Sequence, residues 1–190
     1  MSAPDPKRTS GPKVSTNAND VMYVAEADRQ QEFERLHLSN RILCFVKTLN
    51  APEALRYLFK EPTSFYTQGS PLNPGHWEEL QPRVILPMWE HSGAIYGADI
   101  ASDSPEFVSF YRDLPRDVEV HGPSVYHALM HMFYLHVWEY GGGASEAEQA
   151  FGFAQELGFP ALDRLRALFG NQSASDEEIA SYMSELRDSR

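Results

Sequence analysis

The spacing of apolar residues changes along the chain, which divides it into a helical part, a strand-rich part and a second helical part. In residues 25–38, apolar side chains recur at helical spacing among charged ones, which predicts an amphipathic helix. Asn50 followed by Glu53 is a capping pattern and predicts a short helix that ends near Pro62. Between these two segments, residues 41–49 are rich in apolar side chains and fit either a strand or a helix.

The strand-rich part follows a loop over residues 62–82. Short apolar runs at residues 83–90 and 94–100 flank a His-Ser-Gly turn, which predicts a β-hairpin. Residues 107–111 offer a third strand, and the alternating pattern of residues 117–121 predicts a fourth. An antiparallel meander is the economical arrangement for these strands.

The C-terminal third is predicted to be helical. Apolar residues cover a wide arc of residues 124–140, so we expect this helix to be largely buried against the sheet and to stop at the glycines of 141–143. Ser145, Pro160 and Ser175 each mark the start of a further helix. The predicted fold class is therefore α+β: an antiparallel or mixed sheet flanked by helices, with a helical C-terminal part.

Domain organisation follows from composition. Residues 1–20 hold four prolines or glycines and few apolar residues, which predicts a disordered tail. Over the whole chain, 42% of the 190 residues are hydrophobic and 12% are aromatic, which is enough to bury a core. We therefore expect residues 21–190 to form a single α+β domain.

The cellular compartment is inferred from three features of the sequence. The apolar runs fall far short of the roughly 20 residues that a membrane-spanning helix needs, and the N-terminal residues lack the apolar stretch of a secretion signal. The single cysteine, Cys44, allows no internal disulfide. Because Cys44 lies within an apolar run, it is predicted to be a buried, unreactive thiol rather than a nucleophile. These features favour a cytoplasmic protein.

The formal net charge is −11 and is unevenly distributed. Residues 21–120 contain nine basic and fifteen acidic groups, and residues 121–190 contain four and ten. A body of this charge repels phosphate backbones, so nucleic acid and anionic membrane surfaces are poor partners and a basic protein is favoured. Acidity that serves solubility alone is the competing interpretation.

Histidines are the one residue type that suggests a metal site. His121, His127, His131 and His136 fall within sixteen residues. His127 and His131 are four apart, so they share a helix face and could bind one zinc ion. However, no carboxylate follows His127 as a zinc-protease motif requires. We therefore predict histidines on the helix surface or at the edge of the core, and neither a metal nor another cofactor.

Patterns of nucleophilic catalysis are missing from the sequence. Ser124 and Ser145 stand at predicted helix starts, where capping is the ordinary role of serine. The sequence contains no Gly-x-Ser-x-Gly motif, and its triple glycine lacks the lysine of a phosphate-binding loop. No catalytic residue is predicted.

A partner-binding surface is the more economical interpretation of the acidic and aromatic residues in or beside the predicted sheet. Aromatic side chains anchor interfaces, and a negative field accelerates the docking of a basic partner. The predicted partner-binding residues are Trp77, Glu78, Glu79, Trp89, Glu90, Tyr96 and Asp99. In the competing interpretation, Trp89 and Tyr96 belong to the core.

Three stretches, residues 85–99, 107–110 and 124–139, together resemble the SUKH superfamily. The family has a leading helix and a strand that reads Ile-Pro-Leu-Trp/Phe-Glu, to which Ile-Leu-Pro-Met-Trp-Glu at residues 85–90 is similar. The other shared features are a hairpin partner that ends in an acidic residue and a helix that closes with Trp-Glu. The resemblance implies an α+β fold with helices around a mixed sheet. It also implies a role as a bacterial immunity protein, which is a non-enzymatic inhibitor that binds a toxin domain inside the cell.

The sequence therefore predicts an intracellular binding protein that neutralises a basic toxin domain by occlusion. A regulatory or scaffold adaptor without a toxin partner is the alternative. A zinc-dependent hydrolase that uses His127 and His131 is the third hypothesis.

Overall fold

The computed structural model describes residues 14–16, 22–67, 80, 82–171 and 174–188. The strands are β1 (Val14–Thr16), β2 (Met22–Val24), β3 (Ile85–His91), β4 (Ala94–Asp99), β5 (Glu106–Tyr111) and β6 (Leu114–Gly122). The α-helices are α1 (Arg29–Arg35), α2 (Asn40–Thr48), α3 (Thr63–Tyr66), α4 (Val125–Tyr134), α5 (Ala144–Leu157), α6 (Leu162–Gly170) and α7 (Asp176–Asp188). Two 3-10 turns, η1 (Glu26–Asp28) and η2 (Glu53–Leu58), and one π-helical turn, η5 (Leu135–Gly141), are also present.

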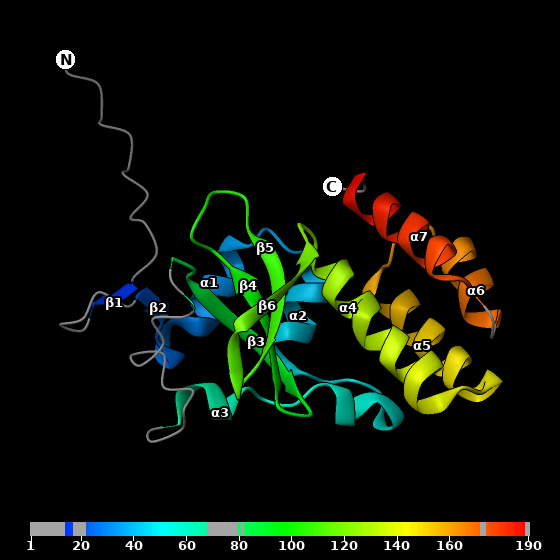
Figure 1. Ribbon diagram of the computed structural model, residues 1–190, viewed down its shortest axis with the longest axis horizontal. Coiled ribbons are helices and arrows are strands. Elements are labelled where there is room, and N and C mark those ends of the chain that lie inside the picture. Colours follow the sequence, from blue (N-terminus) through cyan, green and yellow to red (C-terminus); the bar gives the residue numbers. More distant parts are fainter. Residues whose placement is uncertain (1–13, 17–21, 68–79, 81, 172–173, 189–190) are drawn as a thin grey trace, which may run out of the picture.

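Strands β3 to β6 form an antiparallel sheet in which each strand pairs with the next along the chain (Figure 1). The predicted α+β fold class and meander order are confirmed. The β3–β4 turn consists of Ser92 and Gly93, with φ of 47° and 86°. Two consecutive positive φ angles give the turn that suits the twist of a tight hairpin.

The two edges of this sheet differ. Along β3, Lys60 and Glu90 exchange backbone hydrogen bonds of 3.1 and 2.8 Å. The buried guanidinium of Arg29 donates to the carbonyl oxygens of Pro87 (2.8 Å) and Met88 (2.6 Å), where the register of β3 shifts at a bulge. In contrast, no strand of the described chain pairs with the outer edge of β6.

The sheet carries a core on each face. One face contributes to the main core, which includes Trp89 and Tyr96 and draws residues from Val24 through to Leu186. The opposite face carries a smaller cluster formed by Phe65, Leu80, Ile85, Ile95, Val108 and Phe110. In α7, Tyr182 is fully buried, so this last helix is part of the main core.

Helices α1, α2 and α4 to α7 all contribute residues to the main core on one face of the sheet, whereas α3 contributes Phe65 to the smaller cluster on the opposite face. In Figure 1, α4 to α7 lie to the right of the sheet. Helix α4 contacts β5 and β6, and α7 packs on α4. The hydroxyl of Ser124 accepts from the backbone N–H of Tyr126 (3.3 Å) and caps α4. The helix continues through η5 to Gly142, whose φ is 68°, which confirms the helix predicted over residues 124–140.

Segment 41–49, which fitted either a strand or a helix, belongs to α2. The hydroxyl of Ser39 accepts from the backbone N–H of Ile42 (3.4 Å), and the buried Ile42, Phe45 and Val46 follow helical spacing. Cys44 lies on the other side of the helix and is exposed, so the prediction of a buried thiol is wrong.

The sequence-based predictions for four other segments had different outcomes. The helix predicted after Asn50 is the 3-10 turn η2, and Ser145 lies inside α5 rather than at its cap. The capping box at Ser175 is confirmed, because its hydroxyl accepts from the N–H of Glu178 (3.2 Å) and the carboxylate of Glu178 accepts in return (2.8 Å). Residues 14–16 form strand β1 and not part of a disordered tail, while the rest of the predicted tail lies outside the described residues.

Candidate functional site

The predicted aromatic anchors are not on the surface. Trp89 is 0% exposed and Tyr96 is 2% exposed. Their rings stack on each other with centroids 5.7 Å apart, and Trp89 meets the edge of Phe59 at 5.5 Å. Both residues belong to the sheet face that packs on the main core, so the prediction that they contact a partner is corrected. Trp77 lies outside the described residues.

The four acidic residues predicted to bind a partner differ in where they lie. Glu78 and Glu79 lie outside the described residues, whereas Glu90 and Asp99 are partly buried. The carboxylate of Glu90 accepts hydrogen bonds from the N–H (3.3 Å) and hydroxyl (2.6 Å) of Ser64. The carboxylate of Asp99 accepts from the Val84 N–H (3.1 Å) and from the Arg83 guanidinium (2.8 Å), among other donors. These two carboxylates tie neighbouring segments to the sheet, and a role for them in partner binding stays a prediction.

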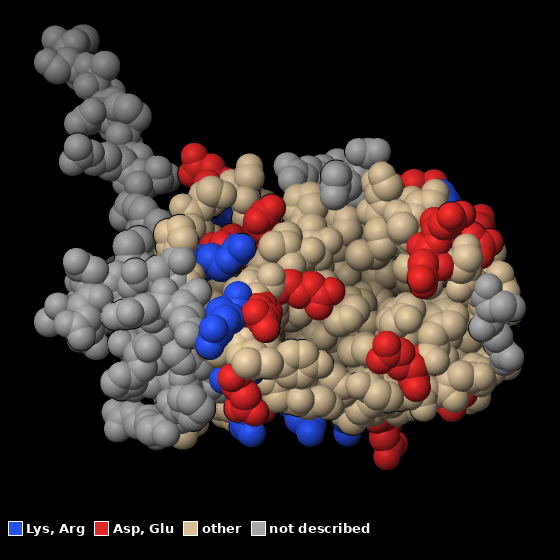
Figure 2. All heavy atoms as spheres, viewed as in Figure 1, with Lys and Arg blue, Asp and Glu red and all other residues tan. Residues whose placement is uncertain are grey.

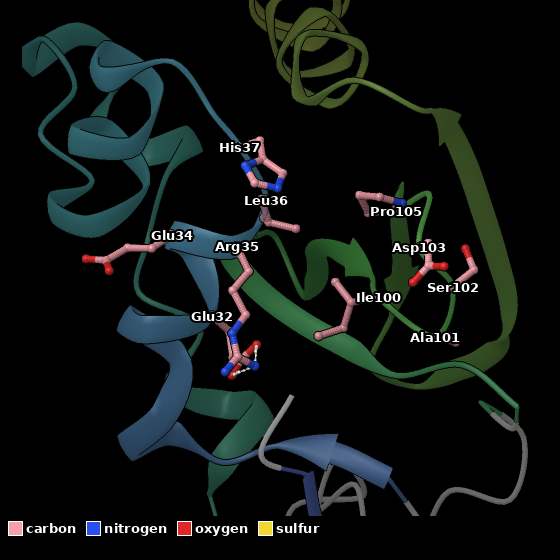
Figure 3. Close-up of a pocket in the computed structure, with 10 residues that line it drawn as sticks. All are labelled: Glu32, Glu34, Arg35, Leu36, His37, Ile100, Ala101, Ser102, Asp103 and Pro105. Atoms are coloured by element: carbon pink, nitrogen blue, oxygen red, sulfur yellow. Dashed lines mark hydrogen bonds and ion pairs between the residues drawn. The ribbon is translucent and has the colours of Figure 1, made fainter. Parts of the chain in front are cut away.

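A cleft of about 760 Å³ lies between the end of α1 and the β4–β5 loop (Figure 3). Its apolar lining includes Leu36, Ile100 and Pro105. On the helix side, Glu32 pairs with Arg35 and Glu34 pairs with Lys47, both at 2.7 Å. These ion pairs neutralise part of the charge on that wall of the cleft.

The β5–β6 hairpin exposes large apolar side chains at the bare edge of the sheet. Tyr111, Leu114 and Val120 are 61%, 51% and 45% exposed, respectively. Charged side chains lie between them along the chain: Asp113 and Asp117 are exposed, as are Arg116 and Arg112, which pairs with Asp113 at 3.7 Å. Apolar side chains with a charged rim beside the edge of a sheet are typical of a protein-docking surface.

A second group of side chains lies where β6 meets α4. His121 of β6 and His131 of α4 face each other with ring centroids 4.8 Å apart. The small Ser109 on β5 leaves room for His121 to reach across and stack on Tyr96 of β4, at 5.7 Å and 9°. At the end of β6, Gly122 has a φ of 148°, and a β-carbon there would lie 2.9 Å from the ring of His127. Glycine therefore permits the close approach of β6 to α4.

Hydrogen bonds fix one nitrogen of each ring. His121 Nε2 lies 2.9 Å from the hydroxyl of Ser109, and His131 Nδ1 lies 3.1 Å from the hydroxyl of Tyr96. The other nitrogen of His121, Nδ1, is 3.9 Å from a carboxylate oxygen of Glu119. One donor atom from each of Glu119, His121 and His131 lies within 4.8 Å of the other two.

Burial determines the charge state of these rings. It lowers the pKa of His121 to about 3, and the neighbouring His131 and His127 act in the same direction. Burial also lowers the pKa of His131, although Glu119 and Glu139 oppose the shift. Both imidazoles are therefore neutral at pH 7 and available as electron-pair donors.

His127 and His136 have other roles. His127 Nδ1 lies 3.1 Å from the carbonyl oxygen of Ser124, and its Nε2 lies 3.0 Å from that of Met183, so the ring connects α4 to α7. His136 Nδ1 lies 2.9 Å from the hydroxyl of Tyr57. The zinc pair considered from sequence, His127 with His131, is thus corrected: the structure brings His121 to His131 instead. Gly122, which follows His121, was the sequence signal of this approach.

Comparison with known proteins gave no match to a family model, to a curated protein or to a solved structure. Among the described helices, none combines the length and apolar character that crossing a lipid bilayer demands. The function is therefore inferred from the geometry of the chain itself.

Proposed function

We propose that this chain binds a basic protein domain and blocks it, and that the outer edge of β6 is the docking surface. The observation that carries this proposal is that no strand among the described residues pairs with this edge. An extended segment of a partner can add a strand there, with backbone hydrogen bonds for affinity and side-chain pockets for specificity. Proteins usually protect such edges, as this one does along β3.

The side chains beside the edge supply anchors. Tyr111, Leu114 and Val120 are the exposed large apolar residues of the hairpin, and burial of such side chains dominates the affinity of an interface. The rim around them is mixed in charge, because Arg112, which pairs with Asp113 at 3.7 Å, and Arg116 are exposed beside Asp113, Asp117 and Glu119. The small excess of negative charge favours a partner that combines apolar side chains with positive charge.

The C-terminal part of the chain is also acidic. Residues 121–190 contain ten acidic and only four basic groups, and two of the basic ones, Arg164 and Arg166, pair with Glu185 and Glu148. In Figure 2, Lys and Arg gather over one part of the visible face, whereas acidic side chains prevail over the part formed by α4 to α7. A negative field of this extent accelerates encounter with a basic partner.

The resemblance of residues 85–139 to the SUKH superfamily suggests which partner this is. Under the proposal, the chain is an immunity protein that neutralises a toxin domain inside the bacterial cell. A toxin that cleaves nucleic acid needs basic residues to hold its substrate, which matches the charge argument.

The first experiment compares variants of the edge. Leu114→Lys and Val120→Lys place charge at the docking surface, and Tyr140→Lys is the matched control because Tyr140 is 59% exposed on η5. The wild-type chain should retain a basic protein from native lysate, identified by mass spectrometry. Calorimetry with that purified protein should then show affinities at least about 100-fold weaker for the edge variants and unchanged for the control. Equal affinities for all variants would contradict the docking surface.

A second experiment separates inhibition from mere binding. The activity of the captured partner is measured while the wild-type chain is added up to equimolar amounts. Stoichiometric loss of activity is expected from an inhibitor that acts by occlusion. A partner that is bound and remains fully active would instead support the adaptor role.

A further inference from the structure

We propose that Glu119, His121 and His131 bind a divalent transition-metal ion of the zinc class, with one coordination position open to an adjoining cavity. The three residues come from two elements, β6 and α4, that meet at this point. Within the described part of the chain they are the one group of His, Cys and acidic residues whose donor atoms converge in this way. Val120 lines the same cavity, so the site adjoins the proposed docking surface, but metal binding there requires no partner protein.

The distances suit a metal after a small adjustment. Zinc binds imidazole nitrogen and carboxylate oxygen at about 2.0–2.2 Å, so donor atoms in a tetrahedral site lie about 3.4 Å apart. His121 Nδ1 and the Glu119 oxygen are already 3.9 Å apart, and all three donor atoms lie within 4.8 Å of one another. The side chain of Glu119 is 61% exposed, so it can rotate inward without disturbing the core.

The outer hydrogen bonds match those of known metal sites. A metal-binding histidine almost always uses its second ring nitrogen to donate to a fixed oxygen, which orients the ring. Ser109 and Tyr96 provide such oxygens for His121 and His131, at 2.9 and 3.1 Å. With these nitrogens held, Nδ1 of His121 and Nε2 of His131 remain as the ring atoms that could bind the metal.

The donor set indicates the class of metal. Two imidazoles and one carboxylate are the ligands of catalytic zinc and of other borderline divalent ions, whereas calcium and magnesium prefer oxygen alone. Three protein ligands leave a further position for water or a small ligand. The three residues line a cavity of about 290 Å³, together with Met130, Tyr134 and Met183 among others. A molecule in this cavity would reach the metal directly.

The test uses the full-length chain without an affinity tag and with Zn²⁺ or Co²⁺ as probe. Calorimetric titration should give one ion per chain, and bound Co²⁺ should show the visible absorption of a four- or five-coordinate site. Zn²⁺ should also raise the thermal unfolding temperature, because it binds only the folded chain.

Substitutions then assign the ligands. Glu119→Gln keeps the size of an exposed side chain, and His131→Gln removes a ring donor; each should weaken Zn²⁺ binding by more than about 100-fold, beyond the effect expected from an outer partner. His37→Gln, at an exposed histidine after α1, is the control and should leave the affinity unchanged.

Tyr96→Phe tests positioning rather than ligation. Loss of the hydroxyl that orients His131 should weaken Zn²⁺ binding by about 10- to 100-fold and shift the Co²⁺ absorption bands, while stoichiometry stays at one ion. The proposal is overturned if the folded wild-type chain binds neither ion stoichiometrically. It is equally overturned if Glu119→Gln binds Zn²⁺ as tightly as the wild type does. Because no partner is present in these assays, they leave the proposed inhibition unaffected.

Discussion

The two edges of the four-stranded sheet are treated in opposite ways. The β3 edge is closed by a backbone bridge to Lys60 and by the guanidinium of Arg29, which lies across a bulge. The β6 edge carries exposed Leu114 and Val120, and no described strand pairs with it. An exposed edge invites association with other chains, so under the proposal it is the β6 edge, and not the closed β3 edge, that receives the partner.

The closed edge gives the largest expected effect. Arg29→Met removes the donor for two carbonyl oxygens and the ion-pair partner of Glu61. Because buried acceptors are left unsatisfied, we expect the free energy of unfolding to fall by about 3 kcal/mol, measured by urea denaturation. Lys47→Met, which breaks the more exposed pair with Glu34, should cost at most about 1 kcal/mol. Equal losses in both variants would show that Arg29 does not hold the β3 edge.

The open edge depends on the glycine at its end. Gly122→Ala forces a side chain onto a φ of 148° and against the ring of His127, so we expect a loss of about 2 kcal/mol in unfolding free energy. Gly152→Ala is the matched control in α5, where a β-carbon meets nothing within 4 Å. It should stabilise the chain by up to about 1 kcal/mol. A neutral Gly122→Ala would mean that β6 can meet α4 in another way.

We expect low pH to destabilise the chain at the closed edge by protonating His91. Burial lowers the pKa of His91 from about 6.5, and Lys60 and His131 act in the same direction, although a hydrogen bond with Tyr57 opposes them. The unfolded chain therefore binds this proton more readily, and stability is lost as pH falls below about 6.5. His91→Gln should show a shallower decline in unfolding free energy between pH 7 and 5. An unchanged slope would exclude His91 as a contributor.

Charge reversal gives the smallest effect and locates the docking surface. Asp113→Lys with Asp117→Lys should slow association with the basic partner by up to about 10-fold and weaken its salt dependence, measured by stopped-flow mixing. Glu78→Lys with Glu79→Lys is the corresponding pair from the sequence-based prediction. If the second pair slows association more than the first, Glu78 and Glu79 rather than the β5–β6 hairpin attract the partner.

The sheet could be predicted from sequence because its information is local. Alternating runs and the Ser92–Gly93 turn define the strands, and short connections leave a meander as the economical order. Helix α2 carried helical spacing in Ile42, Phe45 and Val46, yet its apolar content also suited a strand. The prediction for Cys44 was wrong for the same reason. Whether Cys44 lies on the buried or the exposed side of this segment depends on whether the segment forms a strand or a helix.

The functional geometry was harder to predict because it is tertiary. Whether Trp89 and Tyr96 face the core or a partner depends on which sheet face the helices cover. His121 meets His131 only because the end of β6 lies beside α4. The spacing of apolar residues along a helix does not indicate which strand will pack against it. Two local signals were present: Gly122 at the end of β6, and the i, i+4 spacing of His127 and His131, which misled because His127 is used to connect α4 and α7.

The stacked rings of Trp89, Tyr96, His121 and His131 form a continuous row from β3 to α4. Ser109 makes this row possible, since a larger residue on β5 would separate Tyr96 from His121. The indole of Trp89 at one end is therefore connected, through the rings of Tyr96 and His121, to the imidazole of His131 at the other end. In a chain with Trp77 and Trp138 replaced by phenylalanine, the ultraviolet emission of Trp89 would become an intrinsic optical probe of events at the junction of strand and helix.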